Sequence, residues 1–256
     1  MNPLFEKIGA NDPKDLVLFL LINIHKETNI KKDINQNSNN IPIPNPYDFY
    51  SVYNDFKNCY DSNNNSIISN EFYGCYNTMI TCYQCQNSIH NIQSRNIISF
   101  PLEEVRKFKN HSTKEKVSLI ECFEYYEKID TYPSFYCNIC RLNCPAYNIS
   151  KIINCPKTLI INLNRRKGIE SDVKVTFEEY MDLKNFIVNP DSPYYYELKG
   201  VISHFDSNDE GGNFIAFCKN SCKWYKFNDE IVEICSFKDV LTKGMPYVLF
   251  YSHVAV

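Results

Sequence analysis

Apolar residues near the start of the chain recur at the spacing of a helix. Between residues 12 and 27, one side of the predicted helix is shared by Leu16, Phe19, Leu20 and Asn23, and Ile24 continues the apolar stripe. Asp12 precedes a proline, which suits the first turn of a helix, and acidic side chains at this end complement the helix dipole. We therefore expect an amphipathic helix over residues 12–27.

The next stretch, residues 33–65, has no apolar period. It is rich in asparagine, has three prolines between Ile41 and Pro46, and ends in Asn63-Asn64-Asn65. Asparagine and proline favour turns over packed elements. We expect a mobile surface insertion here.

From Ile67 onward, short apolar or aromatic runs are separated by turn residues, which is typical of strands. Residues 118–129 are an exception and have the pattern of a helix. A helix followed by many strands, without regular alternation, favours an α+β fold. The clearest strands are predicted at residues 158–163, 173–177, 194–204, 213–219, 223–227 and 247–251.

Size and charge narrow the class of protein. The 256 residues are 44% hydrophobic, which is enough for a substantial core. A net charge of -3 gives no electrostatic reason to expect nucleic acid or an anionic membrane as a partner. No apolar run is long enough to span a bilayer, and the first residues lack a secretory pattern. We expect an intracellular protein of the cytoplasm or nucleus.

Four of the twelve cysteines form two Cys-x-x-Cys pairs, Cys82 with Cys85 and Cys137 with Cys140. In each pair the spacing lets two thiolates approach one tetrahedral ion, and four thiolates leave no open position for catalysis. We predict one structural Zn²⁺ site, with Cys144 as a competing ligand. The alternative is that these residues are ordinary half-buried thiols.

The remaining cysteines, such as Cys122, Cys218 and Cys235, lie among apolar or aromatic neighbours. We expect them to be buried and reduced, because intracellular proteins seldom form disulfides.

The segment from Gly211 to Phe217 has the most informative motif, Gly-Gly-Asn-Phe-Ile-Ala-Phe. It resembles the histidine box of the ubiquitin-specific proteases, Gly-Gly-His-Tyr-x-Ala-Tyr, with Asn213 at the position of the catalytic histidine. Other segments resemble that family in the same order along the chain, including Asn11–His25, which is similar to the glutamine box. The resemblance implies a papain-like cysteine protease fold of the ubiquitin-specific protease type, with thumb, zinc-bearing fingers and β-rich palm.

The resemblance also implies how a single domain, residues 1–256, is divided. We expect a remnant of the thumb, the Asn/Pro-rich insertion, the fingers with their zinc site, and a palm that contains the degenerate histidine box. In order, these parts are residues 1–32, 33–65, 66–157 and 158–256.

Ubiquitin or a ubiquitin-like protein is the partner that this resemblance implies. In the family, acids of the glutamine box hold arginines of the ubiquitin tail in a narrow channel. Asp12 and Asp15 match these acids, although helix capping explains both equally well. Phe214 matches the aromatic residue that covers the tail glycines, and His204 matches a histidine that lines the ubiquitin surface.

The catalytic triad is incomplete by the same comparison. Asn228 falls on the Asp or Asn that orients the histidine, and Asp229 beside it matches a frequent acid. Asn213 has no basic nitrogen near neutral pH and cannot act as the general base. The family's nucleophile segment, Asn-x-Gly-Asn-Thr-Cys-Tyr, does not occur in the sequence, and the other histidines stand in no catalytic pattern.

These features predict a ubiquitin-specific protease-like domain without catalytic activity, which binds ubiquitin or serves as a scaffold in a larger complex. The alternative is a fragment of an active cysteine-type deubiquitinase, a thioesterase or isopeptidase, whose nucleophile segment lies outside this chain. A third interpretation is a zinc-stabilised interaction domain that uses the old groove for another partner.

Overall fold

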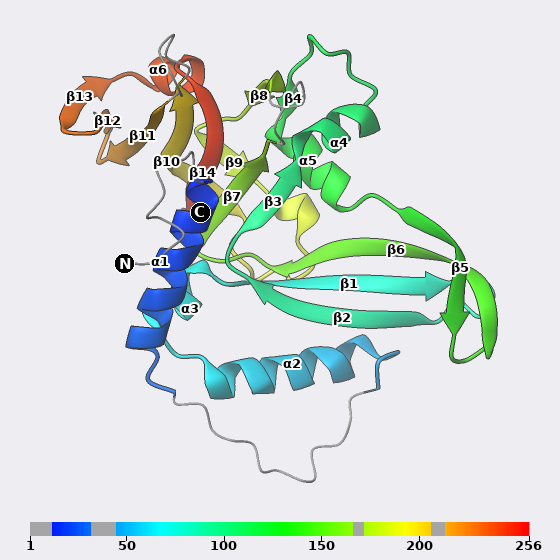
Figure 1. Ribbon diagram of the computed structural model, residues 1–256. Coiled ribbons are helices and arrows are strands. Elements are labelled where there is room, and N and C mark those ends of the chain that lie inside the picture. Colours follow the sequence, from blue (N-terminus) through cyan, green and yellow to red (C-terminus); the bar gives the residue numbers. More distant parts are fainter. Residues whose placement is uncertain (1–11, 32–44, 166–171, 206–212, 256) are drawn as a thin grey trace.

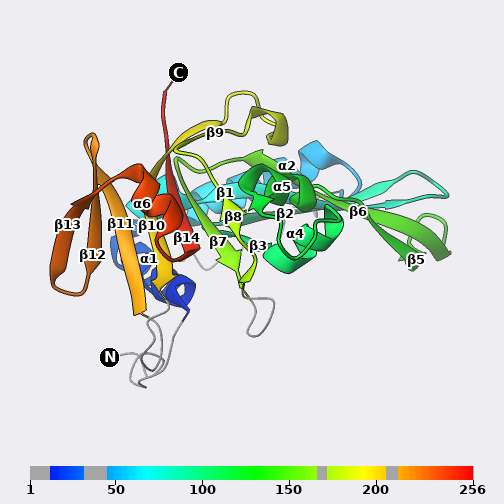
Figure 2. The ribbon, with the colours of Figure 1, turned by 90° about the horizontal axis from the view of Figure 1, so that it is seen from above.

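Two sheets form the frame of the computed structural model, which describes residues 12–31, 45–165, 172–205 and 213–255. An eight-stranded sheet forms the body, and a four-stranded sheet projects from it to one side (Figure 1 and Figure 2). A short third sheet pairs two strands of two residues each. The predicted order, with a helix first and mostly strands afterwards, is confirmed.

The eight-stranded sheet, here called the palm sheet, has the order β13-β12-β11-β10-β14-β7-β3, and β9 also pairs with β10. Its strands are antiparallel except for the parallel pair β3 and β7. Five of the six predicted strands lie in this sheet. The strands are β3 (Ile98–Pro101), β7 (Thr158–Asn164), β9 (Tyr180–Asp182), β10 (Tyr195–Phe205), β11 (Asn213–Asn220), β12 (Lys223–Asn228), β13 (Ile231–Cys235) and β14 (Met245–His253).

The end strand β13 presents apolar side chains to solvent. Ile231, Val232 and Ile234 are all more than half exposed, although β13 pairs along its full length with β12. The predicted strand at residues 173–177 is shorter than expected, since only β8 (Val175–Thr176) pairs, with β4 (Val117–Ser118).

The four-stranded sheet, here called the finger sheet, has the order β2-β1-β6-β5 and is antiparallel throughout. It begins at Gly74, where a Cβ atom would lie 2.9 Å from the carbonyl oxygen of Asn154. Glycine is therefore needed for the close approach of the two chains. The strands are β1 (Gly74–Cys82), β2 (Ser88–Arg95), β5 (Asp130–Cys137) and β6 (Leu142–Asn154).

Helices cover both faces of the palm sheet. The largest apolar cluster lies on one face, where α4 and α5 contribute Leu102, Val105 and Phe123 against strand residues such as Phe217 and Leu249. The helices are α1 (Pro13–Thr28), α2 (Phe49–Asn63), α3 (Ile67–Phe72), α4 (Leu102–Phe108), α5 (Leu119–Tyr126), η3 (Lys184–Phe186) and α6 (Phe237–Thr242).

The other face of the palm sheet is covered by α1 and α3. Leu21 of α1 packs with Ile160 and Val248 in a separate cluster. The helix predicted at residues 12–27 is therefore present, but the stripe that marked it faces outward, because Leu16 and Leu20 are 46% and 48% exposed. The fold buries a different side of α1 from the one that the sequence pattern marked.

The prediction of a mobile insertion is wrong for residues 49–63, which form α2. The helix is capped by the Asp48 side chain, which accepts hydrogen bonds from two backbone amides of the first turn. Its aromatic residues recur at helical spacing and pack against Cys75, Ile92 and Ile153 of the finger sheet. The polar composition hid this stripe. Residues 33–44 lie outside the described part of the chain.

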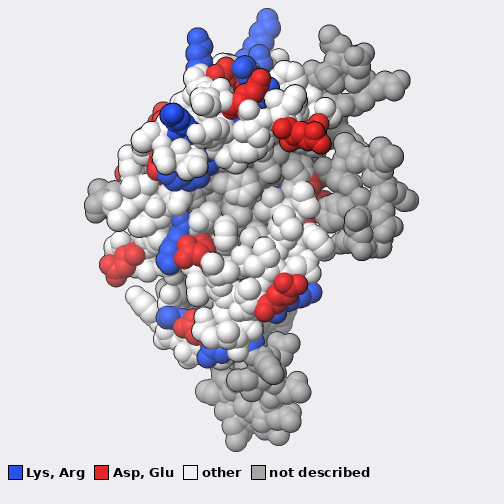
Figure 3. All heavy atoms as spheres, turned by 90° about the vertical axis from the view of Figure 1, so that its left-hand side faces the viewer, with Lys and Arg blue, Asp and Glu red and all other residues white. Residues whose placement is uncertain are grey.

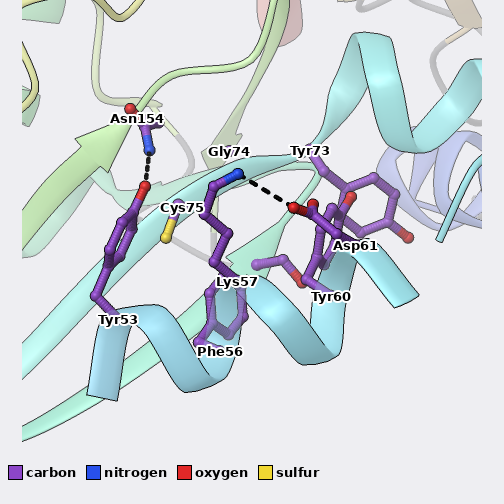
Figure 4. Close-up of a pocket in the computed structure, with 10 residues that line it drawn as sticks. Tyr53, Phe56, Lys57, Tyr60, Asp61, Tyr73, Gly74, Cys75 and Asn154 are labelled. Carbon is purple, nitrogen blue, oxygen red and sulfur yellow. Dashed lines mark hydrogen bonds and ion pairs between the residues drawn. The ribbon is translucent and has the colours of Figure 1, made fainter. Parts of the chain in front are cut away.

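A hollow of about 160 Å³ lies between α2 and the start of β1 (Figure 4). Two polar contacts frame it. The Asn154 amide donates to the Tyr53 hydroxyl at 3.3 Å, and Lys57 pairs with Asp61 at 3.1 Å. Side chains of α2 thus reach both β1 and β6, which fixes the helix on the base of the fingers.

Candidate functional site

Two equivalent turns at the tip of the finger sheet bring four cysteines together. Cys82 ends β1 and Cys137 ends β5. In each turn the backbone amide four residues later donates a hydrogen bond to the carbonyl oxygen of that first cysteine. The residues Gln86 and Arg141, which follow the second cysteine of each pair, both adopt the left-handed conformation, with φ of 58° and 57°. These two turns point the paired thiols at one place.

The geometry fits a zinc ion. The Sγ atoms of Cys82, Cys85, Cys137 and Cys140 all lie within 4.8 Å of one another, and those of Cys85 and Cys137 are 3.6 Å apart. Four thiolates around one Zn²⁺ lie about 3.8 Å from each other, because each Zn–S bond is about 2.3 Å. The predicted site is confirmed as a four-cysteine cluster that can hold zinc.

Hydrogen bonds within the first knuckle favour the thiolate form that zinc needs. The backbone amide and then the side chain of Asn87 lower the pKa of Cys85 to about 6. The backbone amide of Cys85 is the largest of the contacts that lower the pKa of Cys82. Amide donors aimed at sulfur stabilise negative charge there before any metal binds.

All twelve cysteines are free thiols in the structure. Burial of Cys122 raises the pKa of its thiol to about 12, as expected for an inert core cysteine. The expectation of burial is wrong for Cys218, which is exposed on β11, and Cys235 is only partly covered. Apolar neighbours in sequence did not distinguish the two faces of these strands.

The palm residues chosen from the sequence lie on both faces of the sheet. His204 and Phe214 are paired across β10 and β11, with ring centroids 5.0 Å apart. Tyr247 of β14 completes this group, with its ring 5.3 Å from Phe214 and 6.0 Å from His204. Tyr247 also packs against the cluster that contains Leu21 of α1, so the three rings lie on the face that α1 covers.

Asn213 and Asn228 lie on the opposite face of the palm sheet, next to the largest apolar cluster, to which Ile215 belongs. Together with Phe205, Ile215 and Lys226 they line a hollow of about 170 Å³. Strand alternation places Asn213 on the side away from Phe214. His204 therefore points away from this hollow. Gly211 and Gly212 of the same motif lie outside the described residues.

Asp229 stands at the tight turn between β12 and β13, where its φ is 50°. Aspartate tolerates this left-handed conformation better than most residues. The turn explains an acid at this position without any catalytic role, and Asp229 does not line the hollow that Asn213 and Asn228 share.

The two acids at the start of α1 gather around one lysine. The Asp12 side chain caps the helix by accepting from the backbone amide of Lys14 at 2.9 Å. The ammonium group of Lys14 lies 3.8 Å from Asp12 and 3.4 Å from Asp15. The capping interpretation of Asp12 is thus confirmed, and a cationic ligand at this site would compete with Lys14.

The other histidines contact groups that explain their presence structurally. Burial lowers the pKa of His90, and each of the four has a polar or aromatic partner away from the hollow. The partners are Ser66 for His25, Asn77 for His90, Glu121 for His111 and the Tyr196 ring for His253.

Arg165 and Tyr247 are site residues to which the sequence assigned no role. Arg165 donates from Nε to the Pro246 carbonyl at 3.0 Å and from Nη1 to the Val173 carbonyl at 2.6 Å. Its guanidinium lies 5.7 Å from the centre of the Tyr247 ring, and burial lowers its pKa to about 10. Arg165 thereby fixes the start of β14 and the ring that packs on Phe214. Only the pairing of β7 with β14 brings these residues together.

The surface shows no membrane-spanning feature among the described residues, since none of their helices is long and apolar enough to cross a bilayer. On the face in Figure 3, lysine and arginine side chains are interspersed with aspartate and glutamate. Interspersed charges produce no broad field that would steer a polyanion to this face.

Comparison with known proteins identifies the class. The sequence profile described as "Ubiquitin carboxyl-terminal hydrolase" matches residues 1–251. The chain therefore belongs to the ubiquitin carboxyl-terminal hydrolase family, and its fold is the ubiquitin-specific protease type, with β-rich sheets, a few helices and a cysteine cluster that can hold zinc. The predicted family and fold are confirmed.

Two curated relatives illustrate the sequence similarity. Ubiquitin carboxyl-terminal hydrolase 17-like protein B of Mus musculus is 35% identical over 123 residues, which are 46% of this chain and 26% of the relative. Ubiquitin carboxyl-terminal hydrolase 8 of Saccharomyces cerevisiae is 30% identical over 158 residues, 54% of this chain and 33% of the relative. The chain thus matches about a quarter to a third of these relatives.

Solved structures agree on the fold. In the SAGA Ubp8/Sgf11/Sus1/Sgf73 module bound to ubiquitin aldehyde, a chain with 24% identity superposes with a TM-score of 0.69, covering 100% of this chain and 52% of that one. A module with a Ubp8 variant bound to monoubiquitin gives a TM-score of 0.62 at 27% identity, with 81% and 46% covered. The chain spans about half the length of these structural relatives.

Proposed function

We propose that this chain is a non-catalytic ubiquitin-binding module, acting by itself or as a scaffold within a larger complex. The observation that carries the proposal is the hollow shared by Asn213 and Asn228. Neither amide can accept a proton near neutral pH, and the third polar residue there, Lys226, forms an ion pair with Glu233 at 3.2 Å. The hollow offers hydrogen bonds but no general base for a thiol.

Ubiquitin is proposed as the partner because the groups that match tail contacts are present and intact. The Phe214 ring packs against Tyr247 and His204, so it is held in place and can cover a backbone that has no side chains. Asp12 and Asp15 already bind the ammonium group of Lys14, which supports their ability to bind an arginine. The similar Ubp8 structures contain bound ubiquitin, which supports the same choice.

The proposed affinity is in the micromolar range, about -8 kcal/mol or weaker. NMR titration of labelled ubiquitin with the purified chain should shift resonances of the tail. The double variant Asp12→Lys, Asp15→Lys should weaken binding further by repelling the tail arginines, whereas Asp191→Lys, an exposed change elsewhere, should not. If ubiquitin shows no shifts at millimolar protein while an unrelated peptide does, the third interpretation, another partner, replaces this one.

The chemical part of the proposal is tested separately. The chain should neither hydrolyse a ubiquitin C-terminal amide nor react with a ubiquitin probe that bears a cysteine-reactive group. Asn213→His alone should remain inactive, because a base without its nucleophile does not restore the reaction. Labelling of the unmodified chain, mapped by mass spectrometry to a single cysteine, would contradict the assignment.

One observation favours the alternative, a fragment of an active deubiquitinase. The outward side of α1 exposes Leu16, Leu20 and Ile24, each at least 40% exposed, in a stripe along the helix. Such a stripe usually packs against another element. A segment containing the family's cysteine motif, supplied by a longer chain or a second one, is a candidate to cover it. The test adds that segment to the unmodified chain and to Asn213→His. If only Asn213→His with the segment hydrolyses ubiquitin, the fold can support catalysis but the natural Asn213 prevents it, and the alternative fails for the natural sequence.

A further inference from the structure

A fifth cysteine faces the zinc site. Cys144 lies on β6, directly opposite Phe135, and Cys137 is two residues farther along β5 from Phe135. Residues two apart on a strand share a face, so Cys144 and Cys137 are diagonal neighbours on the same side of the sheet. The pairing of Cys82 with Ala146, two residues beyond Cys144, places Cys82 on that side as well.

The surroundings of Cys144 are made of potential ligands. It is 1% exposed and forms one small cluster with Cys82 and Cys137. The Cys144 thiol is in contact with the thiols of Cys82 and Cys140. The Cys144 thiol donates to Oε1 of Gln84 at 3.3 Å, and Gln84 belongs to the first knuckle. The Leu142 carbonyl, at 3.7 Å, is a second acceptor for the same thiol, so two acceptors hold the fifth thiol beside the four.

Cys144 and Cys140 differ in how firmly they are held. Cys140 is only partly buried and sits in the turn before Arg141, a residue in the left-handed conformation. Cys144 is buried near the start of the 13-residue strand β6, where it pairs with Phe135 of β5 beside a register shift, and β6 also pairs with β1 from Ala146 onward. Cys144 is therefore held by strand pairing with β5, whereas Cys140 is held in the hairpin turn between β5 and β6.

We propose that Cys144 is a reserve zinc ligand, which replaces Cys140 so that Cys82, Cys85, Cys137 and Cys144 hold the ion. In the exchange, the Cys144 thiol releases its proton to water and forms a Zn–S bond. Cys140 gives up its Zn–S bond and takes a proton. The site keeps four thiolates and no change of oxidation state occurs.

The test compares three variants, Cys140→Ser, Cys144→Ser and the double variant, with zinc content and competition against a chelator as readouts. Each single variant should bind about one Zn²⁺ with an affinity within roughly tenfold of the unmodified chain, because four thiolates remain. The double variant should bind Zn²⁺ at least about 100-fold more weakly. Losing an outer-shell partner already weakens metal binding roughly 10- to 100-fold, and this variant loses a direct ligand. The matched control is the double variant Cys140→Ser, Cys59→Ser, in which the second change removes an exposed cysteine of α2. Its zinc affinity should equal that of Cys140→Ser alone.

Substitution with Co²⁺ gives a second readout that does not need the double variant to fold. Thiolate-to-cobalt charge-transfer absorption grows with the number of bound thiolates, so Cys140→Ser should retain the full intensity. About three quarters of that intensity would mean three thiolates and would overturn the proposal. The proposal also fails if the double variant binds Zn²⁺ as tightly as Cys140→Ser.

Discussion

Lys219 carries a buried charge whose removal should be costly. Its ammonium group donates to Glu179 at 2.8 Å and to Glu197 at 2.5 Å, and its side chain is only 9% exposed. Lys219→Met would keep the packing of the stem but leave two carboxylates facing each other. Breaking a fully buried ion pair costs about 3–5 kcal/mol. Because these glutamates are 29% and 15% exposed, we expect about 2–3 kcal/mol.

The matched control is Lys199→Met. Lys199 also pairs with Glu197 at 2.5 Å, but its side chain is 43% exposed. Its loss should cost under about 1 kcal/mol, because solvent screens an exposed pair. Urea unfolding at pH 7 measures both variants. Equal losses of stability for the two variants would contradict this prediction, because burial would then not determine the cost of removing the lysine.

The stabilisation by the ion pairs of Glu197 should depend on pH. Burial alone would raise the pKa of Glu197, but hydrogen bonds from Lys199 and Lys219 outweigh it and lower this pKa in the folded state. The stabilisation by these pairs is therefore complete above the unfolded pKa of about 4.3 and is lost as the pH falls through the lower folded value. The stability gap between the unmodified chain and Lys219→Met should narrow on acidification from pH 7 to below pH 4, and a constant gap would count against the assignment.

Two further predictions concern the fingers. Cys82→Ser together with Cys137→Ser should abolish zinc binding and lower the melting temperature. The reason is that Phe135 is the one non-cysteine residue in the described apolar cluster at the finger tip, so little besides the metal holds the tip together. An unchanged melting temperature after chelation of the metal would contradict this. Phe49→Ala should destabilise the chain by about 1–2 kcal/mol in urea unfolding, because the ring contacts Tyr50, Tyr53 and His90. The control Ile30→Ala, at a residue 75% exposed, should change stability by less than about 0.5 kcal/mol.

Spacing made parts of the structure predictable from the sequence. Two Cys-x-x-Cys pairs impose the same turn twice, and each turn aims two thiols at one point, although the two turns meet only because β1 and β5 both pair with β6. Alternating apolar residues likewise located most palm strands, including the one that begins at Asn213. These signals are local, so they do not depend on the partner that each strand acquires.

Other features depend on contacts between distant segments. The local sequence does not determine which side of α1 is buried. Contacts with Val248 and Ile160 bury Leu21 and leave Leu16 exposed. The aromatic stripe of α2 was hidden because asparagine and proline dominate the stretch around it. The two asparagines of the palm hollow lie on different strands, and only the antiparallel pairing of β11 with β12 brings them together.

The exposed apolar strand at the end of the palm sheet has a consequence for handling the protein. In the described sheet β13 has a neighbour on one side, and its outward backbone groups can template pairing with another extended chain. With Ile231, Val232 and Ile234 facing solvent, such pairing would also bury apolar surface, and Glu233 is the single charge along the strand. We expect this edge to limit the concentration at which the purified chain stays monodisperse, and Ile234→Lys should raise that limit, as measured by light scattering.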